Sequence, residues 1–302
     1  MLRFLSHSSW DVTSDLTVLD AVQRGQSGAF RLIEERHHPA VHAYASGCVW
    51  GAEEVEGLTT RAFGTALQAR LAGGPTFGAH QLGCMRRELL NGVRNAAIAR
   101  ARHARSVLTP EFRSWMEKGG AWPLEEGAQL AMAFEYLPQL SQLLLWHGLV
   151  ERDEPSLIAR ISGVPEPDIH GSTRRAKESL RAIRAELHTR CMGSRECCEA
   201  MPWLGTRTEG ASVSGTTEHG SGCPWCREVY EDLTDLDSRL ALYLPAWQLG
   251  WWPGPSYLRI KAVPEPPAGG PRAYRRLART AGRAGGVPTV RAAVRRNSGA
   301  AR

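Results

Sequence analysis

Three residues of types that commonly bind metal ions stand close together in the sequence near residue 220. Their spacing is His219-x3-Cys223-x2-Cys226. Cys-x2-Cys is a common zinc knuckle, and a histidine four residues earlier offers a third zinc ligand. A tetrahedral zinc site needs a fourth ligand, which we expect from a cysteine upstream.

The fourth ligand has three candidates, Cys191, Cys197 and Cys198. A site with four protein ligands is closed to substrate, so the Zn2+ would be structural and would supply folding energy to a module too small for a large core. The cysteines cluster here in a chain in which we read no export signal, and this favours a metal over disulfides. Free thiols or a redox pair are the alternatives.

Helical periodicity dominates the sequence, and no segment alternates as a strand would. We therefore expect an all-α protein in which two small helical domains are joined by a linker and followed by a small helical zinc-binding module and a disordered basic tail. The expected bounds are 14–105 and 128–189 for the two domains, 106–127 for the linker, 190–252 for the zinc module and 253–302 for the tail.

The excess of positive over negative charge comes from one segment. The chain has a formal net charge of +6, and the stretch from Arg259 to Arg302 holds eleven Arg or Lys residues and one acidic residue, Glu265. The rest of the chain is therefore net negative. A basic arm favours polyanions such as nucleic acid, and its alternative role is that of a solubilising tail.

Two predicted helices present cationic faces. One spans residues 80–105, with an apolar stripe opposite its arginines. The other is the second helix of a predicted helix-turn-helix, which follows a short helix and a tight turn at Gly163. Arginine can pair with guanine, whereas lysine and threonine more often contact phosphate. The candidate DNA contacts are Arg86, Arg87, Arg94, Arg100, Arg102, His170, Thr173, Arg174, Arg175, Lys177 and Arg181. The alternative is an ordinary solvated surface.

The order of these blocks resembles the extracytoplasmic-function sigma factors of bacterial RNA polymerase. Region 2 is matched by DAVQRGQSGAFRLIEERHHPAVHAYA (20–45) and GAEEVEGLTTRAFGTALQAR (51–70). Region 4 is matched by AFEYLPQLSQLLLWHGLVE (133–151) and by the helix-turn-helix that ends in RRAKESLRAI. The chain also resembles the actinobacterial subset that carries a C-terminal zinc-finger-like module.

This resemblance implies a role for each block. The helix with Glu53, Glu54 and Phe63 would bind core RNA polymerase, residues 80–105 would open the −10 promoter element, and the helix-turn-helix would read the −35 element. In the zinc anti-sigma fold that the module resembles, apolar residues follow an early cysteine, so Cys198 fits best as the fourth ligand. The module would act on the sigma domains within the chain, or the chain would meet a separate anti-sigma partner.

The sequence gives less support to other functional classes. No membrane span is expected, and we expect a cytoplasmic location. No catalytic triad order, phosphate loop or carboxylate pair is evident, so an enzyme is not expected. Two alternatives remain: a degenerate sigma-like regulator that binds a partner without initiating transcription, and an independent helix-turn-helix DNA-binding regulator.

Overall fold

The structure of the protein is a computed structural model. The residues that it describes are 13–72, 84–120, 127–192, 195–197 and 222–263. They all fall in the first of two compact units, which divide the chain after residue 266.

Regular structure in the described residues is helical, apart from one isolated bridge between Val49 and Leu108. The all-α prediction is therefore confirmed. Within the same residues, no helix has the length and apolar character of a membrane span.

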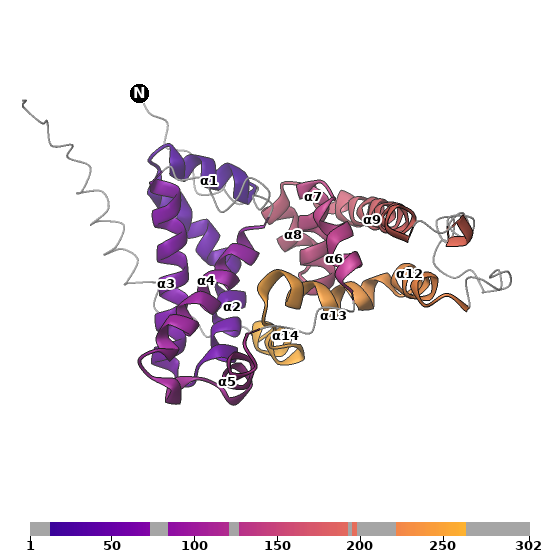
Figure 1. The fold of residues 1–302 in the computed structure, drawn as a ribbon. Helices are drawn as coiled ribbons and strands as arrows, with labels where there is room; N and C mark the ends of the chain where they lie inside the picture. The colour runs from indigo at the N-terminus through magenta and orange to yellow at the C-terminus, as the bar shows by residue number, and fades with distance from the viewer. Residues whose placement is uncertain (1–12, 73–83, 121–126, 193–194, 198–221, 264–302) are drawn as a thin grey trace, which may run out of the picture. The chain divides into compact units, whose positions relative to one another are not determined.

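The first helical group packs α2, α3 and α4 against one another, with α1 across α2 and α3 (Figure 1). Ser14 caps α1, because its side chain accepts a hydrogen bond from the backbone N–H of Thr17. The core is apolar and includes Ile33, Val41 and Leu90. The elements are α1 (Asp15–Gln23), η2 (Ser27–Ala29), α2 (Phe30–Cys48), α3 (Ala52–Leu71), α4 (Met85–Ala101) and η3 (Arg105–Val107).

The second group contains the predicted helix-turn-helix, formed by α8 and α9. Gly163 ends α8 in the left-handed region, with φ of 77°, where glycine carries no Cβ penalty. Ile158 and Ile169 then pack together with Leu144 of α7. The elements are α6 (Ala128–Glu135), α7 (Gln139–Leu145), the π-helix η4 (Trp146–Val150), α8 (Pro155–Ser162), η5 (Glu166–Asp168) and α9 (Ile169–Met192). Helix α5 (Pro110–Glu117) precedes this group in the chain and contacts α2.

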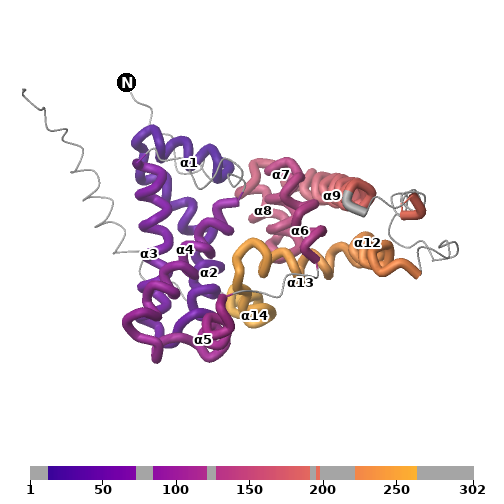
Figure 2. Tube along the Cα trace, viewed as in Figure 1, coloured from indigo at the N-terminus to yellow at the C-terminus, as the bar shows by residue number. Residues whose placement is uncertain are grey.

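The third group brings the C-terminal part of the described chain back onto the first two groups. Figures 1 and 2 show α12 beside α9 and α13 beside α6, and α13 also contacts α4 while α14 contacts α2. The helices are α12 (Pro224–Thr234), α13 (Leu236–Leu249) and α14 (Pro255–Lys261).

Helix α14 corrects one expectation, because it lies inside the segment 253–302 that we expected to be disordered. Pro255 stands at its first turn, where a missing N–H costs nothing. Tyr257 is fully buried against Trp252, with ring centroids 4.7 Å apart. Tyr44 of α2 also donates a hydrogen bond to the Trp251 carbonyl at 2.9 Å. One aromatic contact and one hydrogen bond therefore hold a segment that low overall hydrophobicity had concealed.

Gly127→Ala should destabilise the fold. A Cβ at Gly127 would lie 2.5 Å from Cγ of Tyr243 on α13, and the residue has φ of 74°. We expect the free energy of unfolding to fall by about 1–3 kcal/mol, from strain and from overpacking. Chemical denaturation measures this, and Gly28→Ala is the matched control because nothing lies near its Cβ position. Equal stability of the two variants would contradict the close packing of α13 on α6.

Candidate functional site

A buried cluster of metal-binding side chains joins α9 to α12. His188 of α9, Cys197 and Cys226 of α12 place one ligand atom each within 4.8 Å of one another. Cys226 Sγ lies 3.4 Å from His188 Nε2 and 3.6 Å from Cys197 Sγ. All three side chains are buried. The cluster could therefore hold one metal ion.

Cys223 extends this cluster, because its Sγ lies 3.9 Å from that of Cys197. It is the N-cap residue of α12, and Pro224 opens the helix behind it. A hydrogen bond from the backbone N–H of Cys226 lowers the pKa of Cys223. Burial, followed by the neighbouring thiols, raises the pKa of Cys226 to about 12. A bound cation would offset this penalty, since a coordinating thiol is deprotonated.

The structure brings together two of the four predicted ligands, Cys223 and Cys226. The other two, Cys198 and His219, lie outside the described residues. Cys197, an open alternative from the sequence, is in the cluster. His188 was missed because it belongs to the helix assigned to DNA. Its signal is its place four and eight residues after Arg184 and Leu180, on the same buried face of α9.

An ion pair beside the cluster also fixes α12 to α9. The Arg184 Nε donates to Asp232 Oδ2 at 2.7 Å, and neither side chain is exposed. Arg239 of α13 donates to the other carboxylate oxygen of Asp232 at 2.6 Å. A buried carboxylate with two guanidinium partners sets the relative position of the three helices, because any shift would leave a charge without a partner.

Arg86 of α4, a predicted DNA contact, is in the interior and is 1% exposed. Its Nε donates to His37 Nδ1 at 2.8 Å, its Nη1 to Glu151 Oε2 at 3.0 Å and its Nη2 to the Arg36 carbonyl at 3.2 Å. Since Glu151 precedes α8, the guanidinium joins the first helical group to the second. The prediction that Arg86 faces DNA is therefore wrong for this conformation.

The Glu151 carboxylate gathers further partners from α14. Its Oε2 accepts hydrogen bonds from the Tyr257 hydroxyl at 2.6 Å and from Lys261 Nζ at 2.9 Å. Lys261 also reaches Asp153 Oδ1 at 2.8 Å. Burial would raise the pKa of Glu151, but Arg86 and Lys261 outweigh it and lower this pKa. The network thus includes all three helical groups.

Other cations of α4 are also engaged. Arg87 is buried, and its Nη1 donates to Gln248 Oε1 of α13 at 2.8 Å. Arg94 donates to the carbonyl of Leu249. The prediction that Arg87 is open to DNA therefore also fails in this conformation, because α13 covers its guanidinium.

The end of α4 is more open. Arg100 pairs with Glu54 of α3, with Nε···Oε2 and Nη2···Oε1 distances of 3.0 and 2.5 Å. Arg102 is exposed. Of the predicted α4 contacts, Arg102 is thus the one best placed to meet a polyanion.

The predicted DNA contacts of α9 divide into two sets. His170, Arg174 and Arg175 are exposed at its N-terminal end, and Thr173 is half-buried among them. Farther along, Lys177 pairs with Asp237 at 2.5 Å, and Arg181 Nε donates to the Leu233 carbonyl at 3.3 Å. Helices α12 and α13 therefore engage one set and leave the other open.

The predicted polymerase contacts also differ in exposure. Glu53 is exposed, whereas Glu54 is half-buried and its pKa is lowered by its hydrogen bond with Arg100. Phe63 is 1% exposed, and its ring packs edge-on against Phe30 with centroids 6.5 Å apart. Phe63 is thus a core residue, so its prediction as a surface contact is wrong.

Comparisons with known proteins identify no relative of this chain. No protein-family model matches it, no curated protein matches it and no solved structure matches it.

Replacing His188 by Ala should reduce metal binding. It removes one of the buried ligand atoms, and even changes outside the ligand sphere weaken metal affinity about 10–100-fold. We expect at least about a tenfold loss of affinity, measured by elemental analysis after dialysis against a graded chelator. His170→Ala, an exposed histidine on the same helix, is the control. A full metal content in the His188 variant would rule out this ligand.

The Arg86→Met variant should unfold much more easily than the unaltered protein. The substitution leaves the buried negative charge of Glu151 with one cationic partner fewer. Removing one partner of a buried pair costs about 3–5 kcal/mol. The lowered pKa of Glu151 means that its ionic contribution is present at neutral pH and lost as pH falls. The variant should therefore also lose stability less steeply in acid. Denaturant unfolding from pH 7 to pH 3 tests both points, with the exposed Arg102→Met as the control; if both variants behave alike, the network does not stabilise the fold.

Proposed function

We propose that this chain is a sigma factor of bacterial RNA polymerase, of the extracytoplasmic-function type. In this proposal α1–α4 act on the −10 element, α8–α9 read the −35 element, and α12–α14 hold both in a closed arrangement. The protein would bind core polymerase, and the exposed Glu53 would be among its contacts.

One observation carries the proposal: α12 and α13 contact cations on both helices assigned to promoter DNA. On α4 these are Arg87 and Arg94, and on α9 they are Lys177 and Arg181. Affinity for DNA comes largely from cations that neutralise phosphates. Contacts within the chain compete with DNA at a high effective concentration, so they would hold the protein off its promoter.

Zinc is the metal that best suits the cluster at the end of α9. Thiolate and imidazole ligands in a tetrahedral set favour it. With Zn–S bonds of about 2.3 Å and Zn–N bonds of about 2.0 Å, neighbouring ligand atoms lie about 3.5–3.8 Å apart. The spacings around Cys226 and Cys197 are 3.4, 3.6 and 3.9 Å. With four protein ligands, the ion would fasten α12 to α9 and would not catalyse a reaction.

A second candidate is a sigma-like regulator that binds polymerase without opening promoters. The burial of Arg86 and Arg87 favours it, because cations in a rigid core cannot hold a separated DNA strand.

The test is reconstitution of the full chain with bacterial core polymerase, followed by run-off transcription from a promoter library. We expect Asp237→Asn to raise transcript yield by about two- to fivefold, since it frees Lys177 from a partly exposed ion pair. Asp235→Asn is the matched control, because Asp235 is exposed and its replacement removes the same charge from the same segment.

Three results would change the proposal. Lack of affinity for core polymerase would overturn it, and binding without transcripts would favour the second candidate. An equal yield from both variants would remove the inhibitory role of α13.

A further inference from the structure

A cysteine, a histidine and an aspartate line up where the first two helical groups meet. Cys84 Sγ lies 3.5 Å from His147 Nε2, and His147 Nδ1 lies 2.7 Å from Asp153 Oδ2. Cys84 precedes α4, while His147 belongs to η4 and Asp153 to the loop after it. All three side chains are buried. This is the order of groups that activates a thiol as a nucleophile.

The surroundings of Cys84 favour its thiolate. As the N-cap residue of α4, its sulfur lies at the positive end of the helix dipole. Burial would raise the pKa of the thiol, but His147 and Arg87 outweigh it and lower this pKa. Burial would likewise lower the pKa of His147, but Cys84 and Asp153 raise it to about 9. Both shifts favour the thiolate–imidazolium form of the pair.

The charged groups around this pair come from each neighbouring element. Arg86 of α4 lies 3.8 Å from Asp153, and Lys261 of α14 lies 2.8 Å from the same carboxylate. His37 of α2 is the other titratable ring, with its centroid 6.3 Å from that of His147. Burial and the charge on Arg86 lower the pKa of His37, and its Nδ1 accepts a hydrogen bond from Arg86 Nε.

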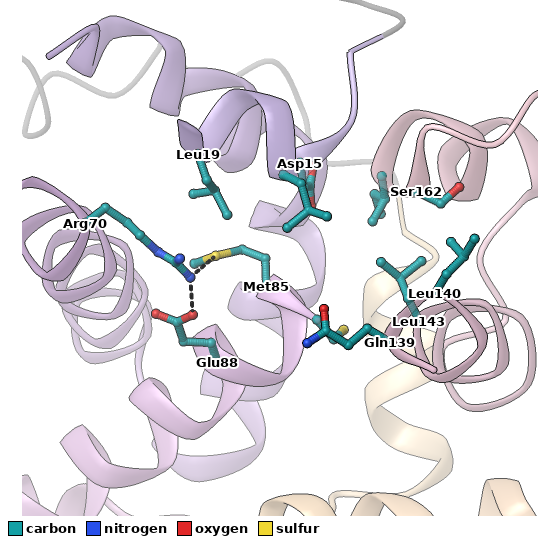
Figure 3. Close-up of a pocket in the computed structure, with 12 residues that line it drawn as sticks. Asp15, Leu19, Arg70, Met85, Glu88, Gln139, Leu140, Leu143 and Ser162 are labelled. Carbon is teal, nitrogen blue, oxygen red and sulfur yellow. Dashed lines mark hydrogen bonds and ion pairs between the residues drawn. The ribbon is translucent and has the colours of Figure 1, made fainter. Parts of the chain in front are cut away.

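Cys84 is also within reach of small molecules, because it lines two cavities. One, of about 210 Å³, lies between α1, α4, α7 and α8 and is lined by Asp15, Met85 and Ser162 as well (Figure 3). The other, of about 500 Å³, runs along α4. A water molecule occupies about 30 Å³, so the first cavity has room for a small peroxide but not for a protein thiol.

We propose that Cys84 is a site of oxidation by small hydroperoxides. The thiolate attacks the terminal peroxide oxygen, so an S–O bond forms and the O–O bond breaks. The sulfur is oxidised to a sulfenic acid, and the peroxide is reduced. The departing alkoxide or hydroxide takes the proton of His147 and leaves as alcohol or water. The reaction removes the ion pair between α4 and η4, so it weakens the contact between the two helical groups. This chemistry does not depend on polymerase binding.

The test treats the full chain with hydrogen peroxide at pH 7, then unfolds it in iodoacetamide and measures the remaining thiol at each cysteine by peptide mass. Cys48 is the internal control, because it is equally buried but burial raises its pKa well above the ordinary value. We expect Cys84 to be lost at least about tenfold faster than Cys48, and His147→Gln to abolish the difference. Equal rates for the two cysteines, or a rate at Cys84 that His147→Gln leaves unchanged, would overturn the proposal.

A second measurement needs no variant that might misfold. The oxidation rate at Cys84 in the unaltered protein should rise less steeply from pH 6 to pH 8 than the rate of an ordinary thiol, because the pKa of Cys84 is lowered. An ordinary thiol would react about tenfold faster for each pH unit in this range. Such a rise at Cys84 would show that its surroundings do not favour the thiolate, and it would overturn the proposal.

Discussion

A guanidinium enclosed by three separate segments of chain is the constraint on which this structure depends. In the folded chain, the guanidinium of Arg86 donates hydrogen bonds to His37, Glu151 and a backbone carbonyl in place of water. Transfer of such a cation out of water is expensive, and it is tolerated only where the partners are complete. Those partners come from α2 and from the segment before α8, while Lys261 of α14 balances the carboxylates. The three helical groups can therefore satisfy these charges together in one arrangement.

The same arrangement explains why the arginine-rich face of α4 is not a free surface here. Gln248 and the Leu249 carbonyl accept hydrogen bonds from Arg87 and Arg94. On α9, Asp237 does the same for Lys177. The contacts of Arg87 and of Lys177 differ in strength. Arg87 is buried, whereas the Asp237 carboxylate is half-exposed, so dissolved salt screens its ion pair with Lys177. The contact at α9 is thus the easier of the two to break.

Local rules predicted much of the fold. Gly163 makes the turn of the helix-turn-helix, and the Cys223–Cys226 spacing identified two members of the candidate metal cluster. These features depend on neighbours within a few residues of each other. Helix α14 was missed because it is only seven residues long and stands in a segment rich in proline, glycine and arginine, where one buried aromatic residue, Tyr257, anchors it.

Long-range pairing accounts for the misses in the site. His188 lies on a helix that was predicted to bind DNA, and nothing close to it in the sequence shows that Cys197 and Cys226 come within reach. Arg86 and Arg87 were placed on the surface because arginine is rarely buried without partners, and their partners are about 50 residues or more away along the chain. A single sequence carries no sign of such pairs.

Helix α9 has a mechanical consequence of its own. Its exposed end, at His170, and the end that carries the candidate metal ligand His188 belong to one continuous helix and lie about 27 Å apart. A tilt of about 5° at one end would displace the other by about 2 Å, which is enough to break or make a hydrogen bond. A tilt of α9 caused by metal binding at His188 would thus move the end at His170, with no contact between the metal and whatever that end touches.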